Sequence, residues 1–109
     1  MAPTVVGPWS EEYEVLGHGQ ALVTYVTGQG FNEQQQTVTL PWKLPMNDAD
    51  APRNPILTAQ LHSNGTITCN IHQWYYDTAS QQSGVGTDKI ISTATSSGAY
   101  VIASCSPPP

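Results

Sequence analysis

Two cysteines are the residues of this chain whose type and spacing most clearly permit chemistry. Cys69 lies on the apolar side of the alternating run 66–71, and Cys105 shares a side with Val101 and Ala103. A period of two is typical of strands with one buried face. If both faces are buried, the sulfurs share one core and can form a disulfide, which would indicate an exported protein. The alternative is two free core thiols, because cysteine is among the most buried residue types.

The three histidines are weak candidates for a metal site, although imidazole is the commonest transition-metal ligand. His62 and His72 lie on two runs that we expect to pair through an Asn64-Gly65 turn. In that pairing the two histidines are several residues away from facing each other, so they would not share a site. His18 lies between two glycines and is interpreted as a turn residue. The chain has no H-E-x-x-H motif and no clustered Cys/His spacing. We therefore expect neither a metal nor a cofactor.

Motifs of hydrolases and of phosphate-binding loops are missing from the sequence. It has no G-x-S-x-G elbow, and Gly84-Val85-Gly86 lacks the strand-to-helix context that would hold a phosphate. The acidic groups Glu11/Glu12/Glu14 and Asp48/Asp50 could serve acid–base work or bind calcium, but we interpret them as a solvated strand face and a loop. The sequence therefore predicts a protein that is not an enzyme.

The aromatic run Trp74, Tyr75 and Tyr76 is the best candidate for a partner or ligand surface. In a strand, Trp74 and Tyr76 share one side and Tyr75 takes the other. Such residues give a large contact area with a polar group, which suits a protein interface, a sugar or an amphipathic lipid. The alternative is that they fill a second core beneath the polar stretch that follows.

Composition limits the classes of partner. The chain has 109 residues, enough for one domain, and its three basic and eight acidic residues give a net charge of −5. A basic patch that binds nucleic acid or an anionic membrane is therefore not expected. The first residues lack the pattern of a signal peptide, and no window is apolar enough to span a membrane. This conflicts with export unless a targeting segment was removed or the chain reaches an oxidising space by another route, such as a virion.

The elements that must position these residues are strands. Alternating or β-branched runs predict seven of them, at residues 11–16, 20–27, 35–40, 56–62, 66–76, 87–95 and 99–105. Seven short strands without a helical period predict an all-β sandwich. Domain boundaries follow from the flanks: 1–10 is a leader or linker stub, 11–105 is one sandwich domain, and 106–109 is a Pro-rich tail.

Turn chemistry predicts how these strands connect. We expect residues 13–40 to form a meander, and Asn64-Gly65 to close a hairpin because both residues tolerate a positive φ. The segment 41–55 contains four prolines, so we expect a loop across one end of the domain and no central strand. A polar loop is expected at 77–86 and a turn at 96–98.

Several short motifs, taken in order, carry a resemblance to a known family. They are Tyr13-Glu14-Val15 with Gly17, then 21–25 (ALVTY), 39–42 (TLPW), 65–69 (GTITC) and 98–106 (GAYVIASCS). This order resembles the soluble domain of mycobacterial MmpS proteins and related actinobacterial exported proteins. The resemblance implies an immunoglobulin-like sandwich outside the cytoplasmic membrane, with a Cys69–Cys105 disulfide. It also implies that Pro41 and Trp42 are packing residues.

The resemblance gives the leading functional hypothesis. MmpS proteins are accessory partners of MmpL transporters, which move lipids and siderophores, so we expect a non-enzymatic cell-envelope domain that contacts a membrane transporter or another envelope protein. A lipid or siderophore is a further candidate ligand. The chain departs from the family in lacking an N-terminal membrane helix and in carrying a long insert, Gln73–Thr95, between its cysteine strands. The alternative is a structural or attachment module of a phage virion.

Overall fold

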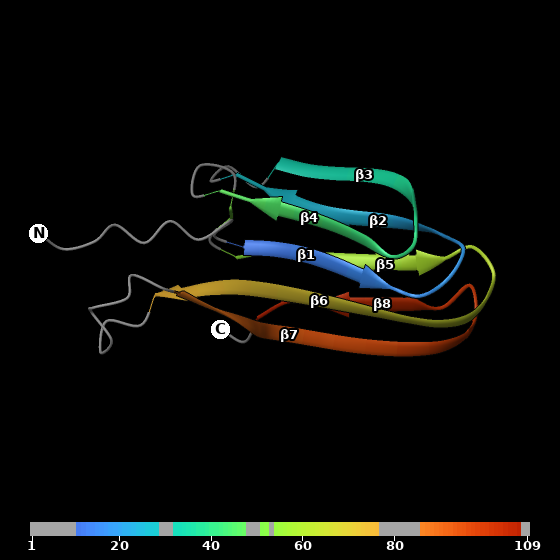
Figure 1. The fold of residues 1–109 in the computed structure, drawn as a ribbon. Coiled ribbons are helices and arrows are strands. Elements are labelled where there is room, and N and C mark those ends of the chain that lie inside the picture. Colours follow the sequence, from blue (N-terminus) through green and yellow to red (C-terminus); the bar gives the residue numbers. More distant parts are fainter. Residues whose placement is uncertain (1–10, 29–31, 48–50, 53, 77–85, 108–109) are drawn as a thin grey trace, which may run out of the picture.

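Eight strands and no helix make up the described part of the chain (Figure 1). The computed structural model describes residues 11–28, 32–47, 51–52, 54–76 and 86–107, with the backbone alone at 74–76 and 86–87. The strands are β1 (Glu11–Leu16), β2 (Gln20–Thr27), β3 (Asn32–Thr39), β4 (Trp42–Met46), β5 (Leu57–Leu61), β6 (Asn64–Tyr76), β7 (Gly86–Ala99) and β8 (Ile102–Cys105). The all-β prediction is confirmed, with one strand more than expected.

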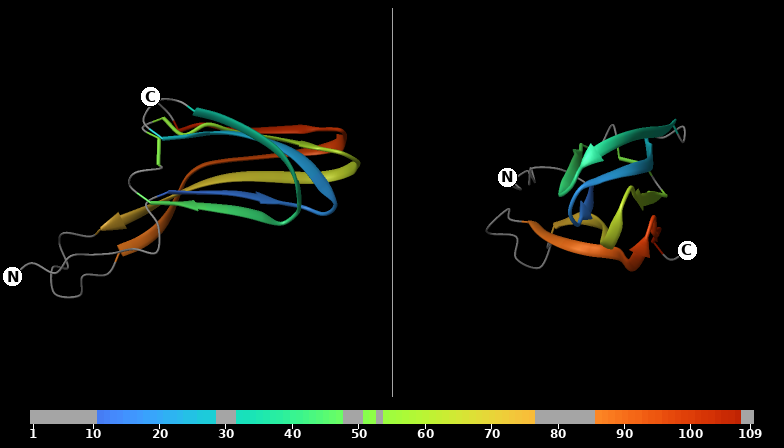
Figure 2. Two further views of the ribbon diagram at one scale, coloured as in Figure 1. Left: turned by 90° about the horizontal axis from the view of Figure 1, so that it is seen from above. Right: turned by 90° about the vertical axis from the view of Figure 1, so that its right-hand side faces the viewer.

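The strands form two antiparallel sheets that pack face to face as a sandwich (Figure 2). Their strand orders are β4-β1-β6-β7 and β3-β2-β5-β8. In both sheets, every second residue of a strand points into the space between the sheets and fills it, because alternate side chains of a strand lie on the same face. The fully buried side chains include Tyr13, Val15, Val23, Leu57, Leu61, Ile67 and Ile71.

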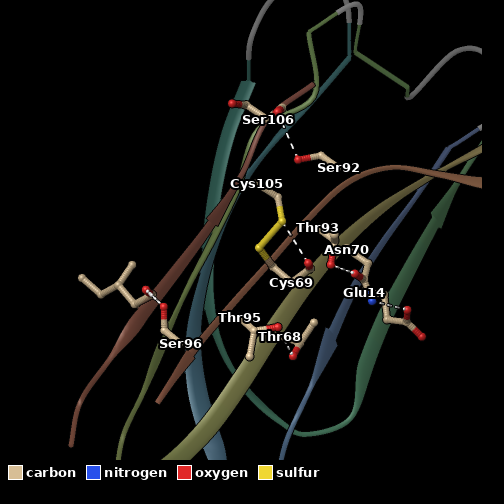
Figure 3. The surroundings of a disulfide bond; sticks show 11 residues. Glu14, Thr68, Cys69, Asn70, Ser92, Thr93, Thr95, Ser96, Cys105 and Ser106 are labelled. Carbon is tan, nitrogen blue, oxygen red and sulfur yellow. Dashed lines mark hydrogen bonds between the residues drawn. A yellow bond between two sulfur atoms is a disulfide. The ribbon is translucent and has the colours of Figure 1, made fainter. Parts of the chain in front are cut away.

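The Cys69–Cys105 disulfide joins the two sheets and confirms that prediction. Cys69 lies on β6 and Cys105 on β8, both side chains are buried, and the two Cα atoms are 6.2 Å apart (Figure 3). Immunoglobulin domains also link their sheets by a buried disulfide. Closing a 36-residue loop contributes about 4 kcal/mol to the stability of the fold in the chain-entropy model.

The predicted Asn64-Gly65 hairpin is wrong, because β5 and β6 belong to different sheets. Asn64 and Gly65 already lie within β6, where they face Ala99 and Gly98 of β7. The chain crosses between the sheets just before them. A Cβ atom at Gly65 would lie 3.3 Å from Leu61 Cδ2, so this glycine permits a close approach of the sheets.

Crossings between the sheets also overturn the predicted meander. β1 pairs with β4 and β6, while β2 and β3 form a hairpin in the opposite sheet. Among the described residues of the segment 41–55 there is no central strand, as predicted, but Trp42–Met46 forms the edge strand β4. Proline is tolerated there because an edge strand has one side without partner hydrogen bonds, and this admits Pro45.

The turn expected at 96–98 is also wrong. β7 continues to Ala99, and the chain reverses at Tyr100, whose φ is 55°. Gly98 has a φ of 135°, and a Cβ atom there would lie 3.0 Å from Val101 Cγ1. Glycine is therefore required inside this strand for the crossing that follows it. The predictions for 1–10 and for the loop at 77–86, apart from Gly86 in β7, lie outside the described residues.

Candidate functional site

A polar cluster lies on the outer face of the β4-β1-β6-β7 sheet. Glu14 of β1 alternates with the core residues Tyr13 and Val15, and Asn70 and His72 of β6 alternate with core residues in the same way. These side chains therefore point away from the other sheet. They are nevertheless buried, since β1 and β6 are the two inner strands and neighbours flank them on both sides.

The centre of the cluster is the imidazole of His72, which bridges two carboxylates. Its Nε2 lies 2.7 Å from Glu14 Oε1, and its Nδ1 lies 2.8 Å from Asp88 Oδ1 of β7. A doubly protonated imidazolium donates to both carboxylates, whereas a neutral ring can donate to only one. The positive charge of the ring therefore completes this arrangement and links β1, β6 and β7 side by side.

Further side chains hold Glu14 in place. Asn70 Nδ2 donates to Glu14 Oε1 at 3.0 Å, and Thr93 Oγ1 donates to Asn70 Oδ1 at 2.6 Å, as Figure 3 shows beside the disulfide. Lys43 of the edge strand β4 places its Nζ 3.6 Å from Glu14 Oε2. All four strands of the sheet thus contribute one member or more to the cluster.

The pKa values in the cluster favour the charged forms. Burial alone would raise the pKa of Glu14, but hydrogen bonds from His72 and Asn70 and the nearby positive charges hold it below its ordinary value. Burial alone would lower the pKa of His72, but the hydrogen bonds and charges of Glu14 and Asp88 raise it above its ordinary value of 6.5. The bridge is therefore complete at mildly acidic pH and weakens as the pH rises.

The arrangement is suited to holding strands together more than to catalysis. The Thr93 hydroxyl is engaged with the Asn70 amide, so the imidazole does not activate it as a nucleophile. The two carboxylates lie against opposite ring nitrogens of His72 and do not converge on one point. In the described part of the chain, no group of three or more Cys, His, Asp or Glu residues could hold a metal ion.

Glu11 is a second buried carboxyl group, at the start of β1. Its side chain faces the same way as Tyr13, the residue is 6% exposed, and its Oε1 atom has no hydrogen-bond partner. Burial raises the pKa of Glu11 to about 7, although a hydrogen bond with the Gln73 side chain opposes the shift. Burial also raises the pKa of Glu12, against the lowering effect of Lys43 and His72.

The interpretation of the acidic group on β1 as a solvated face is therefore wrong. Glu11, Glu12 and Glu14 are each less than 10% exposed, because an inner strand of the sheet has little open surface. The pair Asp48/Asp50 lies outside the described residues. The polar residues Glu14, Asn70 and His72 do share the outer side of their strands in the sequence pattern. That pattern could not identify the neighbours that bury them.

The three histidines do not form one site. His18 and His62 are exposed in connections between strands, while His72 is buried in β6. Because β5 and β6 belong to different sheets, the predicted offset of His62 and His72 along a shared hairpin is wrong.

The aromatic run lies on an extension of the β6–β7 hairpin. Pairing of β6 with β1 ends where Gln73 faces Glu11. Trp74, Tyr75 and Tyr76 pair only with β7, from Asp88 to Gly86, so the described residues supply no third strand there. Figures 1 and 2 show these strand ends projecting beyond the rest of the sandwich. The side-chain directions predicted for the run lie outside what the structure describes.

The two residues expected to pack behave differently. Trp42 is partly buried against the core, and its ring centre lies 5.4 Å from that of Tyr25. Pro41 is exposed and follows Leu40 through a cis peptide bond. Only Trp42 therefore contributes a large packed surface.

The fold and these sites define a disulfide-linked antiparallel β-sandwich with a projecting aromatic hairpin. No family model, curated protein or solved structure matches the chain. No helix in the described residues is long and apolar enough to cross a lipid bilayer.

Proposed function

We propose that this chain is a non-enzymatic binding domain that works outside the reducing cytoplasm and contacts its partner through the part of β6 and β7 that extends past β1. The observation that carries the proposal is the position of Trp74, Tyr75 and Tyr76, where β6 continues past the end of β1. Two paired strands alone are only marginally stable in water, so a two-stranded extension gains stability when a partner packs against it. Tyrosine and tryptophan there can supply contact area at a low cost in conformational entropy.

The base of this hairpin is well suited to hold it in one direction. His72 lies two residues before Trp74, and its hydrogen bond to Asp88 joins β6 to β7 where the two-stranded extension begins. Earlier in β6, before His72, the disulfide at Cys69 ties the strand to the opposite sheet. A recognition element that is already ordered loses less entropy on binding.

The partner that we propose is an MmpL-type membrane transporter, for which this domain would be the accessory protein. Two features support this: the order of motifs shared with MmpS proteins, and a buried disulfide, which forms and persists in oxidising compartments. The extracytoplasmic face of such a transporter lies in that kind of compartment. A lipid or siderophore in transit is the small-molecule ligand that this role implies.

A photo-crosslinking experiment tests the contact. The photoreactive residue p-benzoylphenylalanine replaces Trp74 in cells that also express a mycobacterial MmpL transporter. The control replaces Tyr100, an exposed aromatic residue where β7 turns into β8, at the far end of the hairpin strands. We expect a crosslinked product that contains the transporter from position 74 and none from position 100. Equal products, or none from position 74, would contradict the proposal.

A second experiment measures the energetic role of the aromatic run. Trp74→Ala is expected to weaken binding to the purified transporter by about tenfold or more, as for an aromatic hot spot. Thr95→Ala, an exposed change in the middle of β7, serves as the control and should leave affinity unchanged. Lipid and siderophore panels are tested by quenching of tryptophan fluorescence. If instead the chain co-purifies with assembled virions and binds no transporter, the attachment-module alternative replaces this proposal.

A further inference from the structure

The edges of the two sheets differ in how they are protected. An edge strand presents unpaired N–H and C=O groups to any other strand, and proteins block such edges with proline, lysine, bulges, short strands or covering segments. In the described part of the fold, the edge strands are β4, β7, β3 and β8. The edge strand β4 carries both Lys43 and Pro45.

Two further edges are also blocked. β8 has only four residues, and Ser96 Oγ of β7 donates to the Ile102 carbonyl at 2.8 Å, which covers part of its open side. β7 carries the adjacent charges of Asp88 and Lys89, and its pairing with β6 shifts register opposite Ile71/His72.

β3 is the one edge in the described fold that has none of these devices. Its eight residues contain no proline, lysine or arginine, and Glu33 is their single charge. The strand pairs with β2 without a register shift from Asn32 to Thr39. Every residue except Val38 is exposed. A long, regular and nearly uncharged edge of this kind is suited to accept another strand.

The backbone groups that β3 offers can be identified from one hydrogen bond. The Leu40 N–H donates to the Gly19 carbonyl at 2.8 Å, and this pair continues the register of β3 with β2. Hydrogen-bonded residues alternate along an antiparallel pair. The even-numbered residues of β3 therefore bond to β2, and the odd-numbered ones direct their N–H and C=O groups to the open side: Glu33, Gln35, Thr37 and Thr39.

We propose that two copies of this chain pair antiparallel along β3, about a two-fold axis at Gln36, and join their sheets into one. In this register Gln35 faces Thr37 of the second copy, and Glu33 faces Thr39. Each residue whose N–H and C=O groups point to the open side of β3 then faces such a residue of the second copy. Hydrogen-bonded pairs of an antiparallel ladder require this arrangement. Gln36 meets its own counterpart as a non-hydrogen-bonded pair.

The low charge of β3 is compatible with a second copy at this edge. Each chain carries a net charge of −5, which opposes self-association, and this repulsion is smallest when the contact is made through a surface that itself carries little charge. β3 provides such a surface, and the proposed register keeps the two Glu33 carboxylates apart, opposite threonine. Glutamine and threonine side chains can also form hydrogen bonds across the new strand pair.

Single cysteines report the register. Non-hydrogen-bonded antiparallel pairs bring Cα atoms to about 4.5 Å, within disulfide range. Gln36→Cys is therefore expected to give a disulfide-linked dimer, seen as twice the 11.7 kDa chain mass by intact mass spectrometry. Gln34→Cys is the matched control, because Gln34 lies on the same side of β3 as Gln36, the side that also carries the buried Val38, and in the proposed register it faces Val38 of the second copy. Equal crosslinking of both variants, or preferential crosslinking of Gln35→Cys, would overturn the proposal.

Association itself is measured by sedimentation of the unmodified chain. We expect a concentration-dependent dimer that is lost in Gln35→Pro, because that change removes an outward N–H that the monomer does not use. An unchanged thermal melting curve in dilute solution would show that the Gln35→Pro variant still folds. Thr37→Lys is a second variant that should prevent strand pairing at the same edge. A wild-type chain that remains monomeric at all concentrations would refute the proposal. Binding of the transporter is read separately, so either proposal can fail alone.

Discussion

Glu11→Gln is expected to remove the loss of stability that the buried Glu11 carboxyl should cause as the pH rises. The Glu11 carboxyl is buried, its Oε1 has no partner, and burial raises its pKa from 4.5 to about 7. With a raised pKa, the native state binds the proton more tightly than the unfolded state does. The free energy of unfolding therefore falls as the pH rises from the unfolded-state value through about 7.

The size of the effect follows from these two pKa values. Proton linkage gives a loss of about 2.5 kcal/mol between roughly pH 5 and roughly pH 8 from Glu11 alone. Glutamine has no such ionisation, but its buried amide can leave a group without a partner, at a pH-independent cost of about 1–3 kcal/mol. The variant should therefore be less stable than wild type at the acidic end and about equal to it at the alkaline end.

Urea unfolding across this pH range, followed by tryptophan fluorescence, measures the two curves. Glu33→Gln, the same substitution at an exposed position of β3, is the control and should run parallel to wild type in dilute solution. If the stability difference between Glu11→Gln and wild type stays constant across the pH range, then Glu11 does not titrate in the folded interior and the reasoning is refuted.

Three further perturbations test other parts of the fold. Replacing Cys69 and Cys105 together by alanine should cost about 4 kcal/mol of unfolding free energy, and denaturant melts that retain the wild-type midpoint would contradict this. His72→Gln should cost about 1–3 kcal/mol at mildly acidic pH and less at alkaline pH. The reason is that a raised pKa of His72 in the folded state stabilises the fold at pH values below 6.5, and this stabilisation is lost as the pH rises through the pKa of the folded state. Urea unfolding of the variant and of wild type at both ends of the pH range measures the difference. Tyr13→Phe removes a 2.6 Å hydrogen bond to the buried Val26 carbonyl and should cost about 1–3 kcal/mol, measured by thermal and urea unfolding at neutral pH.

Local periodicity was enough to identify most strands. The alternation in 20–27 and the mixed run 11–16 predicted β2 and β1 with the bounds that the structure has. The apolar side of 66–71 correctly placed Cys69 in the core, and the same reasoning placed Cys105. These predictions succeed because the side of a strand on which a residue lies depends only on its neighbours in the chain.

Strand pairing could not be predicted in this way. Asn64-Gly65 has the composition of a tight hairpin turn, yet the chain crosses to the other sheet before it, and Gly65 serves the close approach to Leu61. A tight hairpin turn and a connection between the two sheets use similar residues. Which of the two forms therefore depends on the distant strands that are available for pairing. The same dependence hid β4, which exists because β1 offers it a partner.

The sequence by itself determined the fold class, the faces of the strands, the cysteine pair and the position of the aromatic run. Only the tertiary structure brought Glu14, His72 and Asp88 together and buried Glu11, because these residues lie on different strands or at an end of the sandwich. It also showed that the aromatic run extends past β1 and that β3 is an unprotected edge. These properties depend on which strands are neighbours, and that is decided by the packing of the whole domain.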